Sequence, residues 1–349
     1  MQQWINTLRD RRSLPAEGYR AILECEDVEA VESLHRQARE VAVERFGNEI
    51  FVRGLIEISN RCRNNCYYCG IRASNADVER YSLSRAEILE ACREGYELGF
   101  RTFVMQGGED PLRSEAEMVE CVREIRERYP ECAITLSLGE MSREQYQRLY
   151  DAGANRYLLR HESHSESHYR KLHPESMSLR NRLECLETLK DIGFQTGTGV
   201  MVGSPFQTID NLVEDILYIE KFAPQMIGLG PFVPHHATRF ADAKVGDIWL
   251  TLKMISIFRL MFPSALIPST TALATVAQDG RERGILAGAN VVMPNLSPAS
   301  LRGHYALYDN KASMGSESAE GLRFLAERLK HIGYKISFER GDYTNDVSK

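Results

Sequence analysis

Short apolar runs alternate with helical patterns through most of the chain. Each run contains the apolar and β-branched residues that favour a strand, and the stretches between the runs have apolar residues at helical spacing. The eight runs occupy residues 52–59, 102–107, 133–138, 156–162, 195–203, 226–232, 265–272 and 289–295. Eight strand–helix units predict an α/β fold with a parallel sheet closed into a full (β/α)8 barrel of the TIM type, which usually takes about 250 residues. A doubly wound open sheet has the same alternation, and counting alone does not separate the two.

The segments on either side of the predicted barrel have different patterns. Residues 1–50 have the amphipathic spacing of helices and are expected to pack on the barrel. Beyond residue 296 the alternation fades into a long loop, a helix at 319–334, and a polar tail of fifteen residues that is expected to fray. The sequence therefore predicts an N-terminal helical segment at 1–50, a barrel at 51–296, and a C-terminal loop, helix and tail at 297–349.

Three of the predicted strands have a polar face. Alternate residues of a barrel strand point to the interior. Arg53 and Glu57 alternate with apolar residues in the first run, Thr135 and Ser137 in the third, and Arg156 lies on the polar face of the fourth. A purely structural barrel fills its interior with Val, Ile and Leu. Inward charges can satisfy one another, but three strands with polar inner faces favour a polar ligand inside the barrel.

Composition and charge exclude several classes of protein. The chain has 349 residues, a net charge of −6 and a sequence pI near 5.9, which argues against nucleic acid as a partner. No apolar run approaches the roughly 18 residues that a membrane helix needs. The N-terminal residues lack the apolar core of a signal peptide, so the sequence predicts a cytoplasmic protein that does not bind a membrane.

The stretch "IEISNRCRNNCYYCGIR" places Cys62, Cys66 and Cys69 directly after the first strand. In a barrel this is the carboxyl end of the sheet, where active sites lie. Closely spaced thiolates in a reducing compartment indicate metal. Structural zinc needs four ligands, usually from two cysteine pairs, whereas an iron–sulfur cubane can use three cysteines and keep one iron open. The other five cysteines are predicted to be small buried hydrophobic residues: Cys25, Cys92, Cys121, Cys132 and Cys185.

The CxxxCxxC spacing, with aromatic Tyr68 before the last cysteine, resembles the signature of radical S-adenosylmethionine enzymes. The resemblance implies that the three cysteines hold one 4Fe–4S cluster and act in catalysis. In that family the amino and carboxylate groups of S-adenosylmethionine bind the open iron. One electron from the cluster then cleaves the sulfonium and releases a 5′-deoxyadenosyl radical.

Other positions match the family's contacts with S-adenosylmethionine. The segment Gly107-Gly108-Glu109 is similar to the GGE motif that meets the methionine amino group, although a turn is the ordinary interpretation of such glycines. Met201 corresponds to an apolar contact with adenine, and simple core packing explains it equally well. The residues that the resemblance assigns to cofactor binding are Tyr68, Gly107, Gly108, Glu109, Ser137, Glu162, Arg182 and Met201.

Segments such as "QGGEDP", "TLSLGE", "GANRYLLRHE", "GPFVPH" and "GANVVMPN" resemble the FeFe-hydrogenase maturases of the HydE type over residues 15–310. The resemblance implies a small anionic substrate inside the barrel, a cysteine-bound iron carbonyl cyanide complex delivered by a partner maturase. It also implies transient contacts with other maturases and with an electron donor. The positions that match the family's inner anion-binding residues, or lie beside them, are Arg53, Gln106, Thr135, Arg156, Thr270 and Thr271.

One departure and three alternatives accompany this interpretation. Some maturases carry a second cluster on cysteines after the eighth strand, but "DNKASMGSESAEG" at 309–321 has none, so a single cluster is predicted. Methylornithine synthases share the cysteine triad and would use the interior for an amino acid in a mutase reaction. Biotin synthase needs further cysteines that are absent here. A carrier that holds iron or zinc on three thiolates without catalysis is the alternative outside this superfamily.

Overall fold

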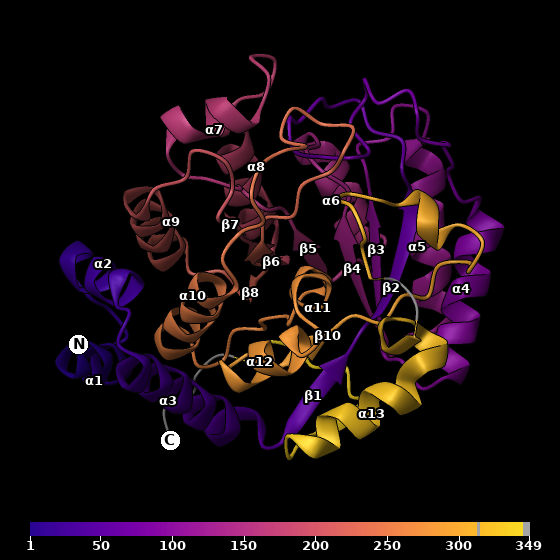
Figure 1. Cartoon of the computed structure of the whole chain (residues 1–349). Coiled ribbons are helices and arrows are strands. Elements are labelled where there is room, and N and C mark those ends of the chain that lie inside the picture. Colours follow the sequence, from indigo (N-terminus) through magenta and orange to yellow (C-terminus); the bar gives the residue numbers. More distant parts are fainter. Residues whose placement is uncertain (313–314, 345–349) are drawn as a thin grey trace.

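The computed structural model describes residues 1–312 and 315–344, and its centre is a parallel sheet (Figure 1). Its six strands pair in the order β2 (Gly54–Ser59), β3 (Thr102–Gly107), β4 (Ala133–Ser137), β5 (Arg156–Leu158), β6 (Gln195–Thr198) and β8 (Met226–Ile227). This order follows the chain without reversal, whereas a doubly wound sheet changes direction at a switch point. The predicted α/β fold with a parallel sheet is confirmed, and the doubly wound alternative is wrong.

Shorter strands form two further small parallel sheets. Strand β1 (Glu49–Val52) pairs with β10 (Val291–Val292) and β11 (Lys335–Ser337), and β7 (Met201–Val202) pairs with β9 (Gly230–Pro231). Isolated parallel pairs link β8 onward to β2: Met226 with Leu266, Pro268 with Val291, and Leu55 with Asn295. The run predicted as a strand at 265–272 forms only such isolated pairs, and helix α11 (Thr271–Val276) begins within it.

Helices follow the strands and cover the outer face of the sheet (Figure 1). They are α4 (Arg85–Glu97), α5 (Glu115–Arg128), α6 (Arg143–Asp151), α7 (Glu166–Leu172), α8 (Leu179–Ile192), α9 (Ile209–Phe222), α10 (Ile248–Met261) and α12 (Gly280–Leu286). The first begins with a capping box, in which Ser84 Oγ accepts from Glu87 N and Glu87 Oε2 accepts from Ser84 N. Along the described residues, no helix combines the length and apolar character needed to cross a membrane.

The N-terminal residues form three helices, as predicted: α1 (Gln2–Arg11), α2 (Ala16–Glu24) and α3 (Val28–Phe46). Asp27 caps α3 by accepting from Ala30 N, and Gly47 ends it with a positive φ of 63°. Tyr19 and Ile22 of α2 are buried in one cluster with Ile216 of α9, so this segment packs against the helices of the sheet. Strand β1 begins at Glu49, just before the predicted boundary.

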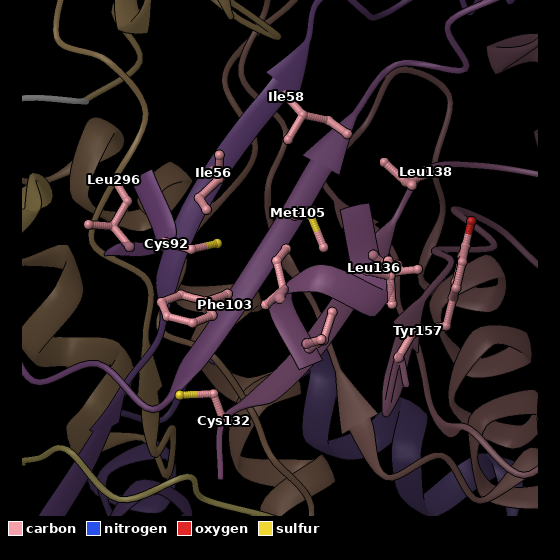
Figure 2. Close-up of a cluster of buried hydrophobic side chains, with 14 of the residues drawn as sticks. Ile56, Ile58, Cys92, Phe103, Met105, Cys132, Leu136, Leu138, Tyr157 and Leu296 are labelled. Atoms are coloured by element: carbon pink, nitrogen blue, oxygen red, sulfur yellow. The ribbon is translucent and has the colours of Figure 1, made fainter. Parts of the chain in front are cut away.

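The outward side chains of the strands form the main core, shown in Figure 2. Ile56, Phe103 and Leu136 come from three neighbouring strands and are fully buried among residues of α4 and α5. Because alternate residues point to opposite faces, the polar residues between them point to the inner face, as predicted. Four of the scattered cysteines are buried as predicted: Cys92, Cys121, Cys132 and Cys185. The prediction for Cys25 is wrong, because it lies partly exposed at the end of α2.

The C-terminal part returns to the sheet after a long loop. The loop contains single turns η1 (Arg302–His304), η2 (Gly315–Glu317) and η3 (Ala319–Gly321), and the predicted helix is present as α13 (Leu322–His331). The expectation of a frayed tail is wrong through residue 344. Strand β11 pairs with β1 there, and the backbone oxygens of Arg340 and Gly341 accept from the buried Arg156. A buried guanidinium needs acceptors, and this segment supplies them.

Candidate active site

The loop between β2 and α4 carries the three clustered cysteines at the carboxyl end of the sheet. Cys62, Cys66 and Cys69 are free thiols and are partly exposed. Three backbone hydrogen bonds of 2.9 Å tie the loop to other segments: Arg63 N to Glu109 O, Tyr67 N to Leu172 O, and Gly70 N to Leu307 O. Residues after β3, at the end of α7 and in the C-terminal loop therefore fix the position of the thiols.

The surroundings of the thiols suit a metal cluster. Burial raises the pKa of all three thiols, that of Cys69 to about 12. Negative charge on Cys69 and Cys62 raises the pKa of Cys66 further, so the three groups are electrostatic neighbours. Bound iron reverses this penalty, because the thiolate is the form that binds metal. No other cysteine is near enough to be a fourth ligand, since the rest lie in the core or at the end of α2. This donor set fits a cubane with one open iron.

Gly108 lets the segment after β3 lie directly against the cysteine loop. A Cβ atom at this position would lie 2.2 Å from Arg61 O and 2.8 Å from Cys62 Cβ. Its backbone N donates to Ser59 O at 3.0 Å, and Gly107 before it is the last residue of β3. Any side chain at position 108 would therefore push away the loop that carries Cys62.

Glu109, Arg63, Glu140 and Arg182 form a row of alternating charges beside the cysteine loop. Glu109 Oε2 accepts from Arg63 Nε at 2.8 Å, and its Oε1 accepts from Glu140 N at 3.0 Å. Arg182 Nε lies 2.7 Å from Glu140 Oε1. Burial works to lower the pKa of Arg182, but Glu140 and other anionic neighbours raise it overall, so the guanidinium stays charged. The predicted contact of Glu109 with a methionine amino group stays a prediction, since its carboxylate has two partners in the chain.

Glu162 follows β5 with its backbone in the left-handed region, at a φ of 66°. Its N donates to Gly199 O at 3.1 Å, and its Oε2 accepts from Arg160 Nη2 at 2.9 Å. Residues other than glycine are uncommon in this region and gather at functional sites. Ser137, the last residue of β4, lies partly exposed at the same end of the sheet. The structure thus brings both predicted positions to the end of the sheet that carries the thiols.

Tyr68 and Met201 lie in one apolar cluster beside the cysteine loop. Met201 is buried there with Leu172 and Phe232, and the Tyr68 ring packs against this group. The Tyr68 hydroxyl lies 3.2 Å from His173 Nε2. Because this cluster adjoins the thiols, it has the apolar character that an adenine ring needs, but packing alone also accounts for Met201.

The inner face of the sheet is polar near its carboxyl end, and some of its hydrogen-bonding groups have partners within the chain. Glu57, Gln106 and Ser137 lie side by side on β2, β3 and β4. Glu57 is fully buried; it accepts from Asn295 Nδ2 at 2.9 Å and forms an ion pair with Lys311. Gln106 Nε2 donates to the hydroxyl of Tyr305 at 3.2 Å. Sequence reasoning missed these partners, because Asn295 is the final residue of the last predicted strand, where no contact was assigned, and the other two lie in a loop without periodicity: Lys311 and Tyr305.

Two threonine hydroxyls of the inner face have no partner. The Oγ1 atoms of Thr135 and Thr270 are buried and make no hydrogen bond within the described residues. A buried polar atom without a partner is unusual in a native protein and indicates a missing ligand or water. Thr271, the next residue, begins α11 and accepts from Thr275 Oγ1 at 2.9 Å through its carbonyl. The hydroxyls of Thr135 and Thr270, two of the predicted substrate positions, are therefore free to hydrogen-bond a ligand.

The two predicted arginines lie at the opposite, amino end of the inner face. Arg156 Nη2 donates to Arg340 O and Gly341 O, both at 3.0 Å, and to Asp342 Oδ1 at 2.7 Å. Arg53 makes weaker contacts, at 3.5 Å with Gly341 O, and its Nε has no partner among the described residues. A substrate role for these arginines stays a prediction, and Arg156 already has an anionic partner in the chain.

The chain is similar to known proteins both in sequence and in structure. The profile of the Radical SAM superfamily matches residues 56–219. The "[FeFe] hydrogenase maturase subunit HydE" of Thermotoga maritima is 41% identical over 326 residues, 93% of each chain. A 3-methylornithine synthase of Methanosarcina barkeri is 30% identical over 318 residues, 90% of this chain and 88% of that protein. The crystal structure of methylornithine synthase (PylB) superimposes with a TM-score of 0.85 at 28% identity, covering 96% of this chain and 97% of that chain.

Proposed function

Since this chain belongs to the radical S-adenosylmethionine superfamily and, within it, to the HydE-type FeFe-hydrogenase maturases, we propose that its inner face binds a small anionic substrate for radical attack. As a member of this family, the chain is an enzyme that uses a 4Fe–4S cluster and S-adenosylmethionine. The isolated strand pairs between β8 and β2 support closure of the sheet into a full (β/α)8 barrel. A closed barrel leaves the inner face open only at its ends.

Cys62, Cys66 and Cys69 would hold a single cluster, which supplies the electron that cleaves S-adenosylmethionine to methionine and a 5′-deoxyadenosyl radical. Gly108 keeps the space beside the cysteine loop free of side-chain atoms. The charged Arg182, partly buried next to Glu140, is suited to a carboxylate of the cosubstrate. Glu162, in its strained conformation, is suited to hydrogen-bond the ribose hydroxyls or the amino group.

The substrate would lie below this site on the inner face. The observation that carries this assignment is the pair of buried, unpartnered hydroxyls of Thr135 and Thr270. Their neighbours Gln106 and Thr271 add further donors, and Arg53 adds a buried charge with an unpartnered Nε. We propose a cysteine-bound iron carbonyl cyanide complex, an anion whose sulfur the radical attacks, because the Thermotoga relative is a hydrogenase maturase. A cytoplasmic location and transient contacts with other maturases belong to the same proposal.

A methylornithine synthase activity is the second candidate, and the superposition with that enzyme at a TM-score of 0.85 supports it. An amino-acid substrate needs an anionic partner for its ammonium group. Glu57 is such a group on the inner face, but it is already paired with Lys311. The maturase relative also has the higher identity, 41% against 30%.

Product analysis separates the candidates. The chain, reconstituted anaerobically, is expected to contain about four iron and four sulfide ions. With dithionite and S-adenosylmethionine it is expected to produce 5′-deoxyadenosine, and an adenosylated product should form when a cysteine-bound iron carbonyl cyanide complex is added. Conversion of lysine in place of that complex would establish the mutase activity. A protein that holds its cluster but yields no 5′-deoxyadenosine would be a carrier.

A further inference from the structure

A hollow of about 450 Å³ lies immediately outside the cysteine loop. Its wall contains Tyr67, which stands between Cys66 and Cys69 and is bonded through its N to Leu172 at the end of α7. Figure 1 shows α7 among the loops that follow the strands, at the top of the view. We name this hollow the cation–aromatic hollow, and its principal lining residues are Tyr67, Arg170, Lys171, Phe206, Arg239 and Phe240.

Phe206 presents its ring to solvent from a strained backbone. Its φ is 65°, and 61% of the residue is exposed. For a bulky residue the left-handed region is a genuine outlier, and such strain persists where function requires it. The ring meets Phe240 edge to face, with centroids 6.1 Å apart. Phe240 is partly buried against the cluster of Met201, so it supports the exposed ring of Phe206, and an exposed aromatic ring held in this way is typical of the anchor residues of a protein interface.

Cationic side chains lie over two of the aromatic rings of the hollow, those of Tyr67 and Phe206. The Arg239 guanidinium is 3.7 Å from the centroid of the Tyr67 ring, and Lys171 Nζ is 5.4 Å from that of Phe206. Neither cation has an acidic partner within the part of the chain that the structure describes, whereas Arg170 is paired with Glu166 at 2.7 Å. The lining has one acidic residue, Glu175, against the three cations Arg170, Lys171 and Arg239, so the hollow is locally positive although the chain as a whole carries a net charge of −6. A positive patch on an acidic protein favours an acidic partner and speeds its association.

We propose that the cation–aromatic hollow is the docking site of an acidic electron-carrier protein of the ferredoxin type. The inference rests on the proposed function, since reductive cleavage of S-adenosylmethionine consumes one electron that must come from outside the chain. Each docking transfers one electron: the carrier leaves oxidised by one electron, and one sulfonium bond breaks to give methionine and the 5′-deoxyadenosyl radical. Docking against Tyr67 brings the carrier to the outer side of the loop that holds Cys66 and Cys69.

The test compares a protein donor with small donors on the holoenzyme. The rate of 5′-deoxyadenosine formation is measured with a reduced acidic bacterial ferredoxin, with dithionite, and with reduced methyl viologen. The double variant Lys171→Glu/Arg239→Glu is expected to lose about tenfold in the ferredoxin-driven rate at low salt. Its rates with both small donors, whose charges are opposite, should stay within about twofold of the unchanged chain. Raising the ionic strength should weaken the ferredoxin-driven reaction of the unchanged chain.

Two further variants control for folding and for total charge. Arg11→Glu/Lys330→Glu makes the same charge change on α1 and α13, far from α7 in Figure 1, and should leave all rates unchanged. Phe206→Asn removes the ring but suits the left-handed backbone, so it should slow only the ferredoxin-driven reaction without lowering the melting temperature. Equal ferredoxin-driven rates in all variants, or equal losses with every donor, would overturn the docking site. Absence of 5′-deoxyadenosine with all donors would instead overturn the proposed function.

Discussion

Three partly exposed thiols lie at the carboxyl end of the sheet. Glu162, whose backbone is in the left-handed region, lies at the same end. At the amino end, Arg156 is fully buried and the chain's own C-terminal segment satisfies it. Both ends come from strands with the same alternation of polar and apolar residues. The difference teaches that a polar inner face does not by itself mark a ligand site. The distinguishing property is whether its donors and acceptors find partners within the chain.

The largest expected effect tests the carboxyl end. Cys66→Ala should abolish 5′-deoxyadenosine formation, because two thiolates cannot replace three in holding the cubane. The melting temperature of the protein without its cluster should change little, since Cys66 is partly exposed and lies in a loop. Iron content and adenosyl products measure the two effects, and Cys92→Ala is the matched control in the core. Full activity of Cys66→Ala would remove this loop from the mechanism.

The next variant tests the amino end. Asp342→Ala should lower the free energy of unfolding by about 2 kcal/mol, since it removes the anionic acceptor of a buried guanidinium. The two carbonyl bonds to Arg156 remain and Asp342 is partly exposed, so the loss stays below the cost of a fully uncompensated charge. Urea unfolding measures it, with Asp242→Ala on an exposed loop as the control. Unchanged stability, together with weaker substrate binding, would show that Arg156 serves the substrate and not the fold.

The helices, the strands and the direction of their faces could be predicted because each depends on local spacing. The capping box at Ser84 and the cysteine triad are likewise local patterns. The partners of Arg156 and of Glu57 could not be predicted, because they lie in segments far away in sequence that have no periodicity of their own: Asp342 for the arginine and Lys311 for the glutamate. Such pairs depend on where the chain returns after folding.

The seventh predicted strand shows that a local pattern can also predict too much regular structure. The run at 265–272 has the apolar residues of a strand, yet it contributes only isolated pairs at Leu266 and Pro268. Proline has no backbone N–H and cannot donate to a ladder, so a continuous strand is unfavourable at that point. The apolar pattern reported burial correctly, since Leu266 and Ile267 are fully buried, but burial does not require a regular strand.

The buried carboxyl group of Asp215, which contacts His161 just before Glu162 in the chain, makes the stability of this end of the sheet depend on pH. Burial raises the pKa of Asp215 to about 8 and lowers that of His161, whose Nε2 is 3.3 Å away, to about 3. Asp215 is therefore protonated in the folded chain at pH 7, whereas an unfolded aspartate is ionised above about pH 4. A folded pKa raised in this way gives stability that is lost as pH rises toward 8.

Asp215 is expected to contribute a loss of about 1.5 kcal/mol between pH 6.5 and 8. The nearby histidines contribute an opposite change, because they are neutral in the folded chain and partly protonated near pH 6.5 when unfolded. Asp215→Asn keeps an oxygen that can accept from His164 N and carries no charge, so it retains the histidine contribution and lacks the Asp215 loss; the difference between the two unfolding free energies should therefore change by about 1.5 kcal/mol over this interval. Urea unfolding at several pH values compares the two chains. The same pH dependence in both would mean that Asp215 is ionised in the folded protein and is stabilised by a neighbour.

The smallest expected effect concerns the hydroxyls that carry the substrate assignment. Thr135→Val replaces a buried, unpartnered hydroxyl by a methyl group of similar size, which should raise the free energy of unfolding by about 0.5 to 1 kcal/mol. Thr196→Val is the matched control, since Thr196 Oγ1 donates to Phe194 O at 3.1 Å and its loss should destabilise the chain. With the iron complex present, Thr135→Val should form less adenosylated product while its production of 5′-deoxyadenosine is retained. Stabilisation with unchanged product would mean that water, and not the substrate, occupies the space beside Thr135.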